Sequence, residues 1–146
     1  MSDFKQNIIE VKSNIDKYLI KTPVLRFDLI DSLCNSEVFF KCENFQHTGS
    51  FKYRAALNAI KNIPYDFKKR GVITHSSGNF AHALSRASHE LNIPCYIIMP
   101  SNTPDFKKKS VLKYTNNIIE CEPNLNAREQ TTKTVMKEKN LSLIHI

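Results

Sequence analysis

Glycine is scarce in this sequence. Only three of the 146 residues are glycine, namely Gly49, Gly71 and Gly78, whereas the usual share is about 7%. Loops that bind nucleotide phosphates need several closely spaced glycines, because backbone amides must approach the phosphate without side chains in the way. The scarcity therefore excludes a Walker A loop and a dinucleotide-binding fingerprint from this chain.

The sequence also lacks paired cysteines and long apolar runs. No two of its four cysteines form a Cys-x-x-Cys motif, and we interpret them as reduced thiols, buried where they fall in strand-like runs (Cys42 and Cys95); the others are Cys34 and Cys121. No apolar run approaches the length of a membrane span, and the first residues lack the apolar core of a signal peptide. We therefore expect a soluble, cytoplasmic protein with no membrane partner.

The positive charge is not concentrated anywhere. The chain carries 21 basic and 14 acidic residues, a net charge of +7, and the excess is shared almost evenly between the two halves. The densest basic runs, residues 68–70 and 107–109, are typical of solvated loops or helix faces. A basic module that binds nucleic acid is therefore the least favoured interpretation, and we expect no nucleic-acid partner.

Hydrophobic periodicity predicts helices and one strand in the first 63 residues. Apolar residues three and four apart predict a helix over residues 4–20, a short helix fits 28–34, and residues 37–42 resemble a strand. A polar loop follows over 43–50. Ser50 is then expected to cap a helix over 51–63, which Pro64 ends.

From residue 71 onward the pattern becomes regular. Short apolar runs over 72–75, 95–99, 117–121 and 141–144 alternate with helical stretches, and the strands start about 23 residues apart. Thr103 followed by Pro104 predicts the start of the second of these helices. The alternation predicts an α/β fold with a parallel sheet built by βαβ crossovers.

Two segments are placed to carry chemistry. The run His75-Ser-Ser-Gly-Asn79 follows a predicted strand and opens a helix, where free backbone amides suit a carboxylate or phosphate; from the spacing alone, an ordinary N-cap turn is the preferred explanation. Lys52 falls in the first turn of another predicted helix, where the helix dipole favours the neutral amine that a nucleophile needs. His82 and His89 are seven residues apart on one helix, but no third ligand is spaced to complete a metal site.

Taken together, these segments resemble a known family. The run Phe39-Phe-Lys-Cys-Glu-Asn-Phe-Gln-His-Thr-Gly-Ser-Phe-Lys-Tyr-Arg54, followed by Thr74-His-Ser-Ser-Gly-Asn79, is similar to the serine racemase and serine/threonine dehydratase family of pyridoxal 5'-phosphate (PLP) enzymes. The resemblance covers nearly all of the chain. It implies the tryptophan-synthase-β-like fold, with residues 1–70 as an incomplete first segment of the large PLP-binding domain and 71–146 as the small α/β domain.

The resemblance implies catalytic roles for two residues. Lys52 matches the lysine that holds PLP and acts as the base on one face of the substrate Cα. Ser77 matches the acid/base on the opposite face, and racemisation needs both groups. The implied reactions are racemisation of L-serine to D-serine, and elimination from serine or threonine to a 2-oxo acid and ammonia.

Binding roles follow in the same way. Ser76, Ser77 and Gly78 match the loop that holds the substrate carboxylate, together with Asn79. Asn79 also matches the asparagine that bonds the ring hydroxyl of the cofactor, and Phe51 matches the residue that packs near its ring. Among these segments the resemblance assigns no metal ligand.

Several departures from the family limit these expectations. Phe80 stands where the family usually has histidine, Ala56 stands where it has glycine, and His47 replaces the lysine of racemases near the ATP site, which puts ATP activation in doubt. Family members are more than twice as long. The glycine-rich loop that grips the cofactor phosphate and the ligands for Mg²⁺ lie in their C-terminal half.

Two interpretations of the chain itself therefore stay open. It is part of a PLP-dependent serine racemase or dehydratase that acts on a small amino acid, or it is a truncated, non-catalytic remnant or split-protein fragment. A fragment is expected to expose apolar surface on residues 1–63 and to pair with a complementary C-terminal half; a homodimer is also possible. The sequence leaves open whether serine, threonine or aspartate is preferred.

Overall fold

A computed structural model describes residues 2–144 of the chain. Short elements and three 3₁₀ turns precede a regular α/β unit, and the last described element is a short strand. The helices are α1 (Ser2–Ile15), α2 (Asp28–Cys34), α3 (Lys52–Lys61), α4 (Tyr65–Arg70), α5 (Asn79–Glu90), α6 (Asp105–Leu112) and α7 (Leu125–Lys139). The strands are β1 (Val24–Leu25), β2 (Phe40–Lys41), β3 (Val72–His75), β4 (Cys95–Pro100), β5 (Ile118–Cys121) and β6 (Ser142–Leu143).

The main sheet has four strands in the order β5-β4-β3-β6, and every neighbouring pair is parallel. Val72 pairs with Cys95 and Ser142, and Ile97 pairs with Ile118. The parallel sheet and the alternation of strands and helices that the sequence predicted are thereby confirmed.

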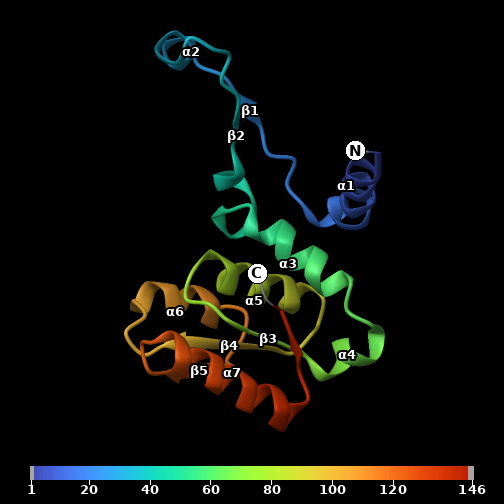
Figure 1. Ribbon diagram of the computed structural model, residues 1–146, viewed down its shortest axis with the longest axis vertical. Helices are drawn as coiled ribbons and strands as arrows, with labels where there is room; N and C mark the ends of the chain where they lie inside the picture. Colours follow the sequence, from blue (N-terminus) through green and yellow to red (C-terminus); the bar gives the residue numbers. More distant parts are fainter. Residues whose placement is uncertain (1, 145–146) are drawn as a thin grey trace.

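The sheet lies between two layers of helices. Successive residues of a strand point to opposite faces, so Val72 and Ile97 pack on one side while Ile73 and Ile98 pack on the other. The first side carries α3, α5 and α6, and the second carries α7 (Figure 1). Burying both faces explains why these strands are almost continuously apolar.

The N-terminal elements extend this core on one side only. Helix α3 packs on α5 through Tyr53, Leu57 and Ile60, all fully buried, and α1 packs on α3 through Ile15. The antiparallel pair β1–β2 and helix α2 form an arm, defined here as residues 23–42, that projects away from the sheet (Figure 1).

Several local predictions need correction. The hydroxyls of Ser50 and Thr103 are buried without a hydrogen-bond partner, so neither caps a helix; Phe51 and Pro104 occupy the N-cap positions instead. The predicted strand over 37–42 is reduced to two residues. Strand β1 and helix α4 were not predicted from the sequence.

The cysteines and the lengths of the helices can be compared with the expectations from the sequence. All four cysteines are free thiols, but only Cys95 is buried, and burial raises its pKa to about 12; Cys42 is half-buried and lies just after β2. Among residues 2–144, no helix has both the length and the apolar composition needed to cross a membrane.

Candidate functional site

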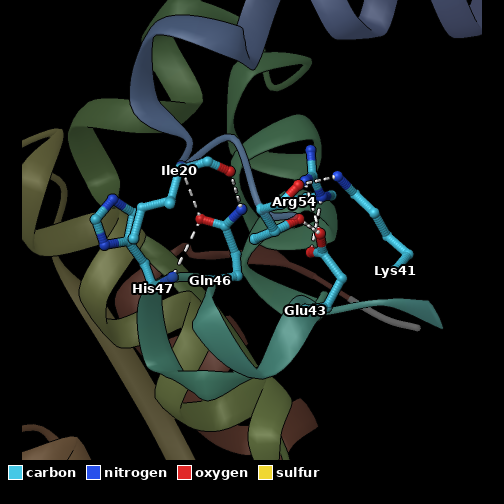
Figure 2. Close-up of polar contacts among 7 residues, drawn as sticks. Ile20, Lys41, Glu43, Gln46, His47 and Arg54 are labelled. Atoms are coloured by element: carbon cyan, nitrogen blue, oxygen red, sulfur yellow. Dashed lines mark hydrogen bonds and ion pairs between the residues drawn. The ribbon is translucent and has the colours of Figure 1, made fainter. Parts of the chain in front are cut away.

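The loop before Lys52 is tied down by a buried glutamine. Gln46 accepts hydrogen bonds from the amides of Ile20 and His47, each at 3.1 Å, and its Nε2 donates to the carbonyl of Ile20 at 2.9 Å (Figure 2). Only 3% of Gln46 is exposed, so these bonds are shielded from water. The side chain therefore joins the segment after α1 to the loop that carries the candidate lysine.

Two left-handed residues complete this loop. Thr48 has φ 64° and Gly49 has φ 69°. Glycine adopts this conformation freely, whereas a β-branched threonine is strained there by about 1–3 kcal/mol. The surrounding contacts must therefore hold Thr48 in place, which turns the chain sharply just before α3.

Lys52 is the first residue of α3 and is half-buried. Its Nζ lies 4.9 Å from the centre of the Phe51 ring, which is itself 56% exposed. The amine is thus held beside an open aromatic face at the start of a helix. This placement agrees with the predicted helix position of Lys52 and leaves its chemical role as a prediction.

An ion pair fixes the first turn of α3 from the side of the loop. Arg54 donates from Nε and Nη2 to the two carboxylate oxygens of Glu43 at 2.8 and 2.7 Å, and Thr22 donates to the same carboxylate at 2.7 Å (Figure 2). The hydrogen bonds from Arg54, and then that from Thr22, hold the pKa of Glu43 below its usual range. Lys41 donates to the carbonyl of Thr22 at 2.7 Å.

A second polar group ties α3 to α5. Tyr53 is fully buried and donates its hydroxyl to Glu90, which also accepts from Nε of Arg86 at 2.8 Å. Burial, and then the bond to Glu90, raises the pKa of Tyr53. His47 meets the Tyr53 ring edge-on at 5.1 Å, and burial, followed by the charge of Arg86, lowers its pKa.

These supporting residues were not identified from the sequence. Glu43 and Arg54 are 11 positions apart, and Tyr53 and Glu90 are 37 apart. No helical or strand spacing links such pairs. Only the fold brings them together.

The segment between β3 and α5 has free hydrogen-bond donors. Within residues 2–144 the backbone amides of Ser77, Asn79 and Phe80 have no acceptor, and the amide of Gly78 makes a long bond of 3.4 Å to Oγ of Ser76. Gly78 is the N-cap residue, and no side chain caps the helix. The segment is therefore not a side-chain-capped turn, and its amides are available to an anion.

The two predicted segments lie on neighbouring elements. The turn over 47–49 packs against α5, the helix that Ser76, Ser77 and Gly78 precede. A hollow of about 210 Å³ is lined by Gly78 and Asn79 and, from α6, by Lys107. A complete cofactor site usually measures about 300–1,000 Å³, so this hollow is smaller than a whole site.

Part of a PLP site fits these residues. Two buried hydroxyls that lack partners, those of Thr48 and Ser50, lie within four positions of Lys52, and the free amides over 77–80 would suit a carboxylate. The described residues offer fewer groups that could bind the phosphate of PLP. Gly71 packs against Pro94, and no glycine-rich loop lies within residues 2–144. The chain fits the aldehyde and carboxylate ends of the cofactor–substrate pair and not the phosphate end.

The two histidines that the sequence analysis considered as metal ligands both lie on α5. His82 and His89 do face the same way, since both lie against the ring of Tyr114 at 5.7 and 5.9 Å. Among the described residues, no group of three or more histidine, cysteine or acidic side chains is placed to hold a metal ion.

Phe80 does not line the candidate site. It is 6% exposed and belongs to the core beneath α5, so the change from the usual histidine fills the core.

We expect Phe80→His to lower the free energy of unfolding by about 2–3 kcal/mol, because a buried imidazole would lose packing and lack a partner. Urea unfolding followed by circular dichroism measures this. Phe106→His, at a side chain that is 69% exposed, is the control and should change stability by less than about 0.5 kcal/mol. Equal effects would contradict the assignment of Phe80 to the core.

Comparison with known proteins places the chain in a family. The family of pyridoxal-phosphate dependent enzymes matches residues 15–145. The serine racemase of Dictyostelium discoideum is 41% identical over 140 residues, which are 96% of this chain and 43% of that protein. The beta-hydroxyaspartate dehydratase of Paracoccus denitrificans is 38% identical over 140 residues, 96% of this chain and 44% of that protein.

Solved structures agree with these sequence matches. Maize serine racemase superposes with a TM-score of 0.91 at 38% identity, over 96% of this chain and 43% of that structure. The chain thus spans less than half the length of the relatives it matches, and it corresponds to their N-terminal part. It has their α/β fold with a parallel sheet. The chain belongs to the family of pyridoxal-phosphate dependent enzymes.

Proposed function

We propose that this chain forms the lysine-bearing part of a PLP-dependent serine racemase with dehydratase activity. The observation that carries the proposal is the placement of Lys52 at the start of α3. The amine follows a strained turn, and that turn packs on the helix that begins with free amides. Relatives of about 40% identity named serine racemase support the substrate class.

The chain's own residues divide the chemistry between two faces of the substrate. When bound, PLP withdraws electrons from the substrate Cα, so that its proton becomes acidic. Lys52 would hold the aldehyde carbon of PLP and take or return the proton at Cα on one face. Ser77 would do the same on the other face. Racemisation needs both groups, whereas loss of the β-hydroxyl needs only one proton removed from Cα and gives a 2-oxo acid and ammonia.

The remaining site residues would bind and orient. The amides over 77–80, with the side chains of Ser76 and Asn79, would hold the substrate carboxylate; Gly78, where a Cβ would meet nothing within 4 Å, leaves room for it. Asn79 would also bond the ring hydroxyl of PLP, and the exposed Phe51 ring would cover one side of the cofactor.

The proposal includes neither ATP nor Mg²⁺. His47 stands where racemases carry lysine, and its lowered pKa favours the neutral imidazole at neutral pH, which is a weak partner for a polyphosphate. The proposed location is the cytoplasm, which suits four unpaired thiols.

A labelling experiment tests the proposal. The chain is mixed with PLP, reduced with borohydride and digested, and the modified lysine is located by mass spectrometry. We expect the adduct to concentrate on Lys52 and to disappear in Lys52→Ala. Lys61→Ala, at the other end of the same helix, is the matched control and should keep it. Equal labelling of many lysines, or none on Lys52, would refute the proposal.

A second candidate is a non-catalytic or split-protein fragment. The observation behind it is that no glycine-rich loop for the cofactor phosphate lies within residues 2–144, which match 43% of the Dictyostelium relative. In that case the chain would label weakly by itself, and labelling of Lys52 would rise when a complementary C-terminal half, which would supply the phosphate site, is present. Size-exclusion chromatography of the chain alone distinguishes this from a homodimer.

A further inference from the structure

The side chain of Gln46 makes the contacts that a paired strand would make. Its Oε1 accepts the amide of Ile20 at 3.1 Å, and its Nε2 donates to the carbonyl of the same residue at 2.9 Å (Figure 2). A primary amide carries a donor and an acceptor in one plane, as a peptide group does, so it can satisfy both backbone groups of Ile20 at once. Ile20 itself lies in no helix or strand. Gln46 therefore replaces the neighbouring strand for a segment that is 26 positions away along the chain.

The same residue reaches both ends of the turn before α3. Oε1 of Gln46 also accepts the amide of His47 at 3.1 Å, and its backbone carbonyl accepts the amide of Gly49 at 2.8 Å. Thr48 lies between them with φ 64°, and its hydroxyl is buried with no hydrogen-bond partner among residues 2–144. The threonine hydroxyl therefore does nothing to offset the unfavourable φ, whereas the bonds of Gln46 hold the residues on either side of it.

The position of Lys52 follows from this turn. Ser50 is extended, and Phe51 is an N-cap residue without a side-chain hydrogen bond, so no cap fixes the direction in which the chain enters α3. Within the part of the chain that the structure describes, the amine of Lys52 makes no hydrogen bond or ion pair; it lies 4.9 Å from the centre of the Phe51 ring. The backbone that carries Lys52 therefore determines where the amine lies.

The rest of α3 is anchored without Gln46. Tyr53, Leu57 and Ile60 are fully buried and pack the helix on α5. These contacts remain when the side chain of Gln46 is changed. Gln46 is 3% exposed, so water does not readily replace the bonds that it makes. Loss of these bonds is therefore expected to alter the turn and the residues that follow it, while α3 stays folded.

We propose that Gln46 is a positioning residue for Lys52. Its side-chain amide ties the turn at Thr48 and Gly49 to the segment at Ile20, and this turn sets the place of the Lys52 amine. A displacement of about 1 Å at a reacting group can lower a rate by about 100-fold, so a small change in the turn is enough to matter. The importance of this position for PLP rests on the proposed function, whereas the effect of Gln46 on the amine does not.

NMR spectroscopy tests the proposal without any cofactor. In the chain isotopically labelled at the lysine ε-carbons, Lys52 should show the upfield shift of a group held over the Phe51 ring. Lys61 is the internal reference, because its Nζ lies 4.7 Å from the centre of the Tyr18 ring at the other end of α3. Gln46→Met keeps the length of the side chain and removes its hydrogen bonds. We expect it to abolish the upfield shift of Lys52 and to preserve that of Lys61.

Labelling by PLP and borohydride is the second readout. In Gln46→Met the adduct on Lys52 should fall on the order of tenfold relative to the original chain, because the amine is no longer held in place. Val135→Ala is the matched control. It removes volume from the core on the opposite face of the sheet, so it should lower stability and leave both readouts of Lys52 unchanged.

A second variant covers the case in which Gln46→Met does not fold. At neutral pH the carboxylate of Gln46→Glu keeps the two acceptor bonds and loses only the donor to the carbonyl of Ile20, so it should change both readouts in the same direction and by less.

The outcomes separate the role of Gln46 from the proposed function. An unchanged Lys52 signal in both Gln46 variants would overturn the inference, and so would a change that Lys61 or the Val135→Ala chain shows equally. Undiminished labelling in a variant that has lost the Lys52 shift would overturn it as well, since the place of the amine would then not affect its reaction with the aldehyde. If the original chain is not labelled on Lys52, the proposed function fails, and the NMR comparison still decides the role of Gln46.

Discussion

Replacing Gly71 with alanine is expected to lower the free energy of unfolding by about 3–5 kcal/mol, or to prevent folding. Gly71 has φ 110°, which side-chain-bearing residues rarely adopt, and an added Cβ would lie 2.6 Å from the carbonyl oxygen of Pro94. That carbonyl accepts the amide of Val72 at 2.8 Å, and the carbonyl of Gly71 accepts the amide of Ser142 at 3.0 Å. Backbone strain of about 1–3 kcal/mol therefore adds to a clash of similar size at the start of β3.

The other two glycines provide matched controls. Gly49 also has positive φ, but its Cβ would meet nothing within 4 Å, so Gly49→Ala should cost only about 1–2 kcal/mol. Gly78 has negative φ and open space, and Gly78→Ala should be close to neutral. Urea unfolding of the three variants measures the order. If Gly71→Ala and Gly49→Ala were equally destabilising, the close approach to Pro94 would be of no consequence.

The regular half of the fold could be predicted because its signals are local. Strands β3 and β4 are short apolar runs, and α5 carries an apolar stripe that includes Leu84, so periodicity alone identifies them. The short elements could not be predicted in this way. Strand β1 has only two residues and is defined by pairing with β2, which depends on a long return of the chain.

The two predicted helix caps were wrong for a related reason. Ser50 and Thr103 have the residue type that caps helices, but their backbones lead into helices that begin later, and both hydroxyls are left buried and unpaired. Capping is a matter of one hydrogen bond, and sequence alone does not place it.

The residues of the candidate site could be predicted from sequence motifs, but the contacts that hold them in place could not. Lys52 and Ser77 are recognisable because their neighbours in sequence resemble a family. What holds them could not be anticipated, because the bonds of Gln46 to Ile20 and of Glu43 to Arg54 join residues that only folding brings together. The positive φ of Thr48 could not be predicted either, since threonine rarely adopts the left-handed conformation.

The Glu43–Arg54 pair leads to the second large effect. At neutral pH, Glu43→Gln is expected to lower the free energy of unfolding by about 2–3 kcal/mol, because Arg54 would lose a two-point ionic partner in a site where the carboxylate is only 15% exposed. Glu37→Gln is the control. Glu37 pairs with Arg26 but is 66% exposed, so its loss should change stability by less than about 1 kcal/mol.

The destabilisation caused by Glu43→Gln should decrease as the pH is lowered. The pKa of Glu43 is lower in the folded chain than in the unfolded chain, so the folded state binds fewer protons. The stability from this group is therefore complete above its unfolded pKa of about 4.3 and is lost as the pH falls through the folded value. Glu43→Gln has no such proton, so its unfolding free energy should approach that of the original chain as the pH is lowered below about 4. Urea titrations at a series of pH values measure the difference. A difference that stayed constant down to low pH would mean that Glu43 acts through shape and hydrogen bonding alone, and that its charge does not help to hold the first turn of α3.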